Sequence, residues 1–210
     1  MGKGLVLLAL VFLICVTHLT AQKVSKTKLE MPEKMWVMMH PFISVRVKNR
    51  LEHCYSVIEQ VKKQKSLDQF ENGGCLDAFR HVFTMAFLAQ HIRISKLRSL
   101  GVAHEKSNRI QFEKNIFENG ELPDSVSCQM DLLNNEIGFI LGKKYRNVGT
   151  DSLAELIVVE IMRGFAWQIA RDQNGNYLRC DGREIDIREW ERKWRIPKCL
   201  VKSNSKLANN

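Results

Sequence analysis

Apolar side chains recur every three or four residues along much of the chain, which is the spacing of one face of an α-helix. The first long stretch of this kind starts at Pro41, a residue suited to an initial helical turn, and its apolar positions are Val47, Leu51, Cys54, Ile58 and Val61. The same spacing predicts helices over residues 76–92 and about 95–108. Residues 22–39 show no clean period, so we expect an extended lead-in there.

The helical pattern continues into the second half of the chain. Asp124 or Ser125 can cap a helix that reaches about Tyr145, because a side-chain oxygen there can accept the first free N–H groups. The SLAE stretch at residues 152–155 fits a capping box. It predicts a further helix that ends near Gly164, a residue type common after helix ends.

Beyond that glycine the pattern changes to short segments. Asn174 and Gly175 form the dipeptide most typical of a two-residue β-hairpin turn, so we predict a hairpin around them. A short helix is expected over residues 189–194. The chain is therefore predicted to be mainly α, a helical bundle of about five helices with a C-terminal β-hairpin, in a single domain of residues 40–202.

The first residues predict export. A lysine at position 3, an apolar run over residues 5–16 and the small residue Ala21 have the order of a secretory signal peptide of residues 1–21. The apolar run is shorter than the roughly 20 residues that span a bilayer. We therefore expect an exported protein, periplasmic or extracellular, without a transmembrane anchor.

The cysteines and the net charge indicate which disulfides and which binding partners to expect. Five cysteines follow the predicted signal peptide, so at least one has no partner within the chain; they are Cys54, Cys75, Cys128, Cys180 and Cys199. Export permits disulfides, and we expect Cys180 to pair with Cys199. The formal net charge of +9 is spread along the chain, without the basic and aromatic patches that mark nucleic-acid binding. Anionic lipid or an envelope polymer remains open as a partner.

Three predicted helices each carry polar side chains at helical spacing among apolar positions. Spacings of three and four place each set on one face, and a buried polar group without a partner costs about 1–3 kcal/mol. These groups must therefore satisfy one another or take part in chemistry. The sets are Asp77, Arg80 and His81; His104, Glu105 and Asn108; and Asp131, Asn134 and Asn135.

One hypothesis is a divalent metal site. Histidine and carboxylate side chains are ligands for zinc and related ions, and His81, His104 and Asp131 would supply three of them from three helices. The zinc-protease motif HExxH is excluded, because Asn108 stands where the second histidine would be.

A second hypothesis is acid–base chemistry without a metal. His81 would act as the base and Asp77 would orient it, with His104 and Glu105 completing a catalytic site. Arg80, Asn134 and Asn135 would bind substrate through their hydrogen-bond donors. In either case the expected function is a hydrolase acting on envelope polymer or lipid.

The third hypothesis is structural. Pairs such as Arg80 with Asp131 and His81 with Asn135 would then fix how the helices pack, since buried polar networks specify unique cores. The alternative function is accordingly a non-enzymatic envelope or interaction protein.

The motifs DAFRH at residues 77–81, AHE at 103–105 and MDLLNNEIG at 130–138 resemble an uncharacterised family of exported or toxin-associated bacterial proteins. The pattern of that family is approximately DAFRHAxW, AHE and MDLxNNxxG. The resemblance implies no established activity. It implies that the matching positions matter, which are Asp77, Arg80, His81, His104, Glu105, Asp131, Asn134, Asn135 and Gly138. The aromatic residue of the pattern is replaced near Thr84 and Met85.

Overall fold

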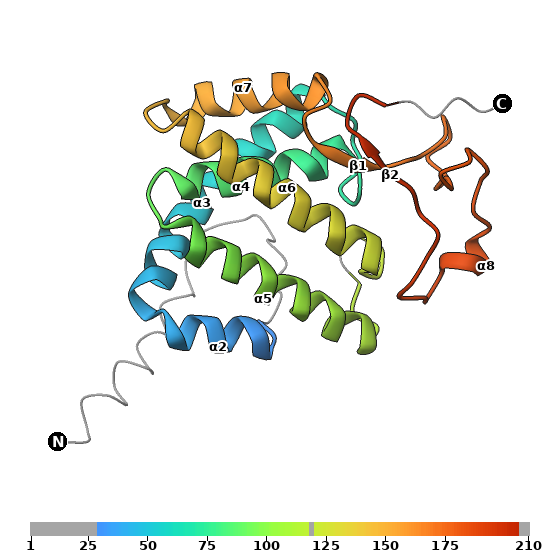
Figure 1. Cartoon of the computed structure of the whole chain (residues 1–210), viewed down its shortest axis with the longest axis horizontal. Coiled ribbons are helices and arrows are strands. Elements are labelled where there is room, and N and C mark those ends of the chain that lie inside the picture. The colour runs from blue at the N-terminus through green and yellow to red at the C-terminus, as the bar shows by residue number, and fades with distance from the viewer. Residues whose placement is uncertain (1–28, 118–119, 206–210) are drawn as a thin grey trace.

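The computed structural model describes residues 29–117 and 120–205, so the predicted signal peptide lies outside the described part. The described part is mainly helical, with one small antiparallel strand pair near its C-terminal end, and the predicted fold class is confirmed (Figure 1). Within it, no helix combines the length and apolar character needed to cross a bilayer. The elements are α2 (Met31–Met39), α3 (Pro41–Gln64), α4 (Cys75–Ala89), α5 (Ile94–Glu113), α6 (Ser125–Lys144), α7 (Thr150–Met162), β1 (Trp167–Ile169), α8 (Ile187–Trp190) and β2 (Leu200–Lys202).

Helix α4 is the centre of the fold. Its apolar side chains pack with those of α3, α6 and α7 in the largest hydrophobic cluster, and Phe79 and Phe83 are fully buried there. Helix α6 lies closely against α4 because Gly138 and Gly142 face its backbone. A Cβ atom on Gly142 would stand 2.4 Å from the carbonyl oxygen of Ala86. This close contact fixes the distance between the polar faces of the two helices.

The start of α6 follows its local sequence. The Asp124 side chain accepts hydrogen bonds from the backbone N–H groups of Val126 and Ser127, at 2.7 and 3.0 Å, and so caps the helix as predicted. The buried Lys198 Nζ lies 2.9 Å from the same carboxylate. The C-terminal segment is therefore attached to the first turn of α6.

The prediction of an extended lead-in before residue 40 is wrong, since residues 31–39 form α2. Glu30 and Glu33 make a capping box, and Pro32 occupies the first turn, where its missing N–H has no cost. Of the α2 side chains only Trp36 is buried, and its Nε1 donates to Ser99 Oγ of α5 at 2.9 Å. One buried position in nine residues leaves no helical period to detect.

Helix α7 begins earlier than expected. It starts at Thr150 after Gly149, and no side-chain cap forms at its start, so the capping box expected at residues 152–155 is wrong. The helix ends at Met162, close to the predicted end at Gly164, whose φ of +88° is the left-handed conformation that glycine favours.

The C-terminal region is held by strand pairing and by a disulfide. Strand β1 pairs antiparallel with β2, with Ile169 opposite Leu200, and the predicted turn at Asn174 and Gly175 is closed by a single bridge between Arg171 and Tyr177. Helix α8 ends at Trp190, before the predicted 189–194 stretch does.

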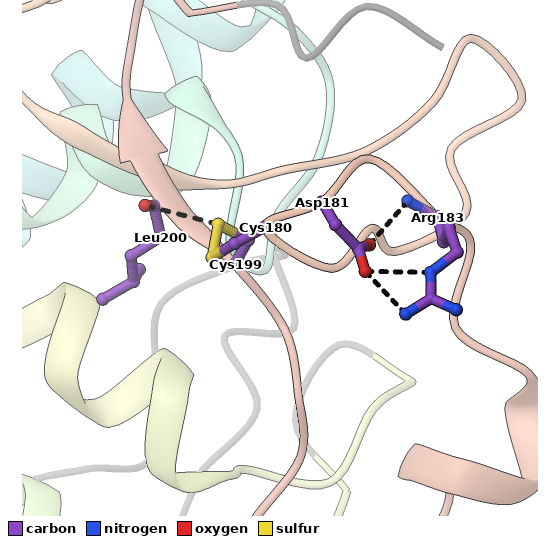
Figure 2. The surroundings of a disulfide bond; sticks show 5 residues. All are labelled: Cys180, Asp181, Arg183, Cys199 and Leu200. Carbon is purple, nitrogen blue, oxygen red and sulfur yellow. Dashed lines mark hydrogen bonds and ion pairs between the residues drawn. A yellow bond between two sulfur atoms is a disulfide. The ribbon is translucent and has the colours of Figure 1, made fainter. Parts of the chain in front are cut away.

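The expected disulfide is present. Figure 2 shows Cys180 joined to Cys199 beside the start of β2. Cys54, Cys75 and Cys128 are free thiols, and burial raises the pKa of the Cys54 and Cys75 thiols to about 12. These free thiols are therefore protonated at neutral pH, which makes them weak nucleophiles.

Candidate functional site

The polar faces of α4 and α6 meet at His81. Its Nε2 atom lies 3.2 Å from Asp131 Oδ1 of α6 and 3.6 Å from Asp77 Oδ1, one turn earlier on α4. Its Nδ1 atom lies 3.3 Å from Asn135 Oδ1. The imidazole ring therefore has a carboxylate pair on one side and an amide oxygen on the other.

Asp77 is held in place by the loop before α4. The backbone N–H of Gly73 donates to its Oδ2 at 2.7 Å, and Arg80 donates to its Oδ1 at 2.6 Å. Gly73 has a φ of +74°, which few residues other than glycine adopt. Its carbonyl accepts the backbone N–H of Ile169 at 2.7 Å, so β1 and this loop together position the Asp77 carboxylate.

His81 is set up as a neutral ring. Burial lowers its pKa from 6.5 to about 4, although the Asp77 carboxylate opposes the shift. A neutral ring that donates Nδ1–H to Asn135 Oδ1 turns the Nε2 lone pair toward Asp77 and Asp131, because the partner of one nitrogen decides which tautomer forms. Charge-assisted N–H···O bonds are about 2.7–2.9 Å long. The 3.2 and 3.6 Å distances from Nε2 are longer than such bonds.

The same three side chains have the arrangement of metal ligands. Asp77, His81 and Asp131 each offer one ligand atom, and these atoms lie within 4.8 Å of one another, a grouping found nowhere else in the described residues. Bonds of about 2.0–2.2 Å to a tetrahedral zinc ion place its ligand atoms roughly 3.3–3.6 Å apart. The distances from His81 Nε2 agree with that spacing. Metal-binding histidines also typically donate the second ring N–H to an oxygen acceptor, a role that Asn135 Oδ1 can fill here.

The structure does not bring His104 into this group. His104 Nδ1 lies 2.9 Å from Glu33 Oε1 of α2. Although burial opposes ionisation of Glu33, the contact with His104 lowers the pKa of its carboxyl group. Of the predicted ligands His81, His104 and Asp131, the structure therefore brings together His81 and Asp131, and it groups them with Asp77 instead of His104.

Glu105 and Asn134 also have structural partners. Glu105 is buried and accepts a hydrogen bond from Asn108 at 2.9 Å. The Asn134 amide donates to the Trp167 carbonyl at 3.0 Å and accepts the Trp167 N–H at 2.9 Å. Asn134 therefore joins α6 to β1 through both ends of its amide. The sequence instead predicts that this side chain binds substrate.

A small polar cavity lies beside the carboxylate pair. Its volume is about 30 Å³, which is room for one or two water molecules. Asp77, Arg80 and Asp131 form one side, and neither His81 nor His104 contributes to its lining. The Arg80 side chain, 30% exposed, links this side to solvent.

The rest of the cavity lining comes mostly from residues outside the three polar sets predicted from the sequence. It includes Asn108, Asp124, Tyr177 and Lys198. Asn108 is 4% exposed, and its Oδ1 has no hydrogen-bond partner in the described part of the chain. Burial lowers the pKa of Lys198, while Asp124 opposes that shift. The sequence feature that could have pointed to Lys198 is its position directly before Cys199, because a disulfide at Cys199 limits where this lysine can lie.

A comparison with protein families identifies the helical part. A family described as a domain of unknown function (DUF6973) matches residues 34–164, which is more than half of the chain. The chain belongs to this family. Searches of the curated proteins and of the solved structures found no match.

The part that matches DUF6973 contains only some of the cavity wall. Asp77, His81 and Asp131 fall within residues 34–164, whereas Tyr177 and Lys198 lie beyond them. The polar cluster therefore belongs to the DUF6973 helices, and the C-terminal segment adds the wall that faces it.

Proposed function

We propose that this chain is an exported hydrolase whose reaction uses a divalent metal ion held by Asp77, His81 and Asp131. The observation that carries the proposal is the position of His81 Nε2, 3.2 and 3.6 Å from two carboxylate oxygens. In the tautomer that donates Nδ1–H to Asn135, the neutral ring places its Nε2 lone pair against two negative oxygens, which is unfavourable. A cation between the three atoms would remove that repulsion.

At such a metal centre, the neighbouring side chains would each have a separate role in hydrolysis. A bound divalent ion polarises a carbonyl or phosphoryl oxygen and lowers the pKa of its water. Asn135 would fix the His81 ring, and the cavity next to Asp77 and Asp131 has the volume for the attacking water. Arg80, half-buried at the rim, would attract an anionic group of the substrate.

Export and substrate class form part of the same proposal. Export is supported by the predicted signal peptide and by the Cys180–Cys199 disulfide, since disulfides persist in oxidising compartments. An exported hydrolase meets envelope polymers and lipids. An anionic polymer or a phospholipid would place a negative group beside its hydrolysable bond, and Arg80 could bind that group.

Metal analysis of variants tests the proposal. We expect the purified protein, after incubation with zinc or manganese and desalting, to retain about one ion per chain. His81→Ala and Asp131→Asn should reduce this content to background, with helical circular dichroism unchanged. His53→Ala changes an exposed histidine of α3 and is the matched control. Absence of retained metal in the unaltered protein, across zinc, manganese, iron and cobalt, would overturn the proposal.

A second function is favoured by the contacts of Asp77. Arg80 and the Gly73 N–H already engage both of its oxygens without a metal, as expected if the cluster is structural. The chain would then be a non-enzymatic envelope or interaction protein. Unfolding of His81→Ala, together with no metal in the unaltered protein, would favour this function.

A further inference from the structure

Helix α2 and the first turn of α3 expose an unusual number of large apolar side chains. The exposed fractions are 59% for Met31, 69% for Met38, 64% for Met39 and 87% for Phe42. Met35 is exposed at 43% on the same helix. Single exposed apolar residues are ordinary, but a contiguous group of them marks an interaction surface. We call these five side chains the methionine patch.

The methionine patch continues into a groove between α2 and α5. The groove has a volume of about 550 Å³, and Met35 and Met39 line it from α2 while Val102 lines it from α5. Helix α2 lies at the edge of the helical part opposite α7 (Figure 1). The apolar surface is therefore at the outside of the fold, where an extended partner can reach it.

The charge around the methionine patch is positive. Residues 31–50 contain four lysines or arginines and one acidic residue, Glu33. The side chains of Glu33 and Glu30 are each 13% exposed and paired, with His104 and Lys114 respectively. Exposed basic side chains near the patch include Lys34 of α2 and Arg46 of α3, one helical turn after Phe42, and Lys106 lines the groove from α5.

We propose that the methionine patch inserts shallowly into an anionic lipid surface. Short helices with an apolar side and basic neighbours lie in the plane of a bilayer, with apolar side chains at the acyl boundary and basic ones near headgroup phosphates. Met38 and Phe42 would enter the lipid, and Lys34 and Lys106 would contact the phosphates. This inference does not rest on the metal centre.

A second copy of the chain fits the patch less well. A symmetric dimer through the methionine patch would bring the same surface together twice, including Lys34, Arg46 and Lys106. Like charges placed together oppose association. An anionic bilayer instead offers complementary charge and an apolar layer at once.

Vesicle binding tests the proposal. The exported chain is sedimented with vesicles of phosphatidylglycerol or of phosphatidylcholine in 0.1 M salt. We expect at least about tenfold tighter binding to the anionic vesicles, weakened by higher salt. The variant Met38→Asp/Phe42→Asp should reduce binding about tenfold or more, since charge is strongly disfavoured at the acyl boundary. Lys34→Glu/Lys106→Glu should remove the preference for phosphatidylglycerol.

The matched control changes exposed apolar residues elsewhere. Ile140→Asp/Met162→Asp alters side chains of α6 and α7 that are 56% and 61% exposed, and it should bind vesicles like the unaltered chain. All the proteins share the same N-terminal residues, so any contribution from those residues cancels. Metal content is measured on each variant, and it should not change, which separates this test from that of the hydrolase.

Two results would overturn the proposal. One is equal binding of the unaltered chain and Met38→Asp/Phe42→Asp to anionic vesicles. The other is a concentration-dependent dimer in sedimentation that the same variant abolishes, because it would show that a second copy occupies the patch.

Discussion

A buried neutral imidazole beside two carboxylates makes the folded state sensitive to acid. The pKa of His81 is lowered by burial to about 4, whereas an unfolded histidine titrates near 6.5. The unfolded chain therefore binds a proton that the folded chain lacks between these values. The stability due to this difference is present above about pH 6.5 and is lost as the pH falls toward 4.

His81→Gln should reduce that pH dependence in the metal-free protein. The contribution of His81 is roughly 2.5 kcal/mol between pH 7.5 and pH 4.5, at about 1.4 kcal/mol per pKa unit. Urea unfolding at pH 7.5 and pH 4.5 measures it as the difference between the unaltered chain and His81→Gln. His53→Gln, at an exposed position, should keep the pH dependence of the unaltered chain. An equal loss of stability in all three proteins would contradict a buried neutral His81.

Single residues also show how far the sequence could define the candidate site. Helical spacing places Asp77 with His81 and Asp131 with Asn135, so each half of the cluster could be anticipated. The partners of His104 and Asn134 could not, because Glu33 and Trp167 lie 71 and 33 positions away. Such contacts depend on how the elements pack, which spacing along one helix does not report.

The helices and strands differ in how well their sequences predict them. Helix α6 has a side-chain cap at Asp124 and a long apolar line, so its start and end could be predicted closely. Helix α2 buries only Trp36, and its exposed methionines hide the helical period. The turn at Asn174 and Gly175 could be predicted locally. The pairing of β1 with β2 could not, since Ile169 and Leu200 are distant in sequence.

Gly142→Ala should separate α4 from α6. The added Cβ would lie 2.4 Å from the Ala86 carbonyl oxygen and 2.9 Å from its Cα, and backbone atoms cannot turn aside as a flexible side chain can. Overpacking of this kind costs about 1–3 kcal/mol. Because α6 carries Asp131 and α4 carries His81, we also expect weaker metal retention. Chemical denaturation and metal titration measure the two effects.

Gly149→Ala is the control for that substitution. Nothing lies within 4 Å of the Cβ it would add, and the φ of Gly149 is −65°. Gly149 is the N-cap of α7, where glycine is preferred to alanine, so this substitution should cost about 0.5–1 kcal/mol and leave metal retention unchanged. Gly142→Ala with stability and metal retention like those of Gly149→Ala would show that the two helices adjust without strain.

At the scale of the whole molecule, the C-terminal segment closes the polar cluster from outside the part that matches DUF6973. Lys198 is buried between Asp124 and the ring of Tyr177, at 2.9 Å from the carboxylate and 3.6 Å from the ring centre. The next residue, Cys199, is bonded to Cys180. The disulfide therefore limits how far Lys198 can move away from the cavity.

Replacing both cysteines with serine, Cys180→Ser/Cys199→Ser, should loosen this segment while the helices stay folded. The bond closes a loop with a sequence separation of 19, and closing a loop of that length stabilises a fold by about 3 kcal/mol. We expect faster hydrogen exchange and proteolysis within residues 171–199, and faster release of bound metal because water reaches the cavity more easily. Arg183→Gln removes an exposed ion pair with Asp181 next to the disulfide (Figure 2) and should change little. Unchanged exchange over residues 171–199 in the double variant would mean that β1–β2 pairing and the Lys198 contacts hold the segment without the disulfide.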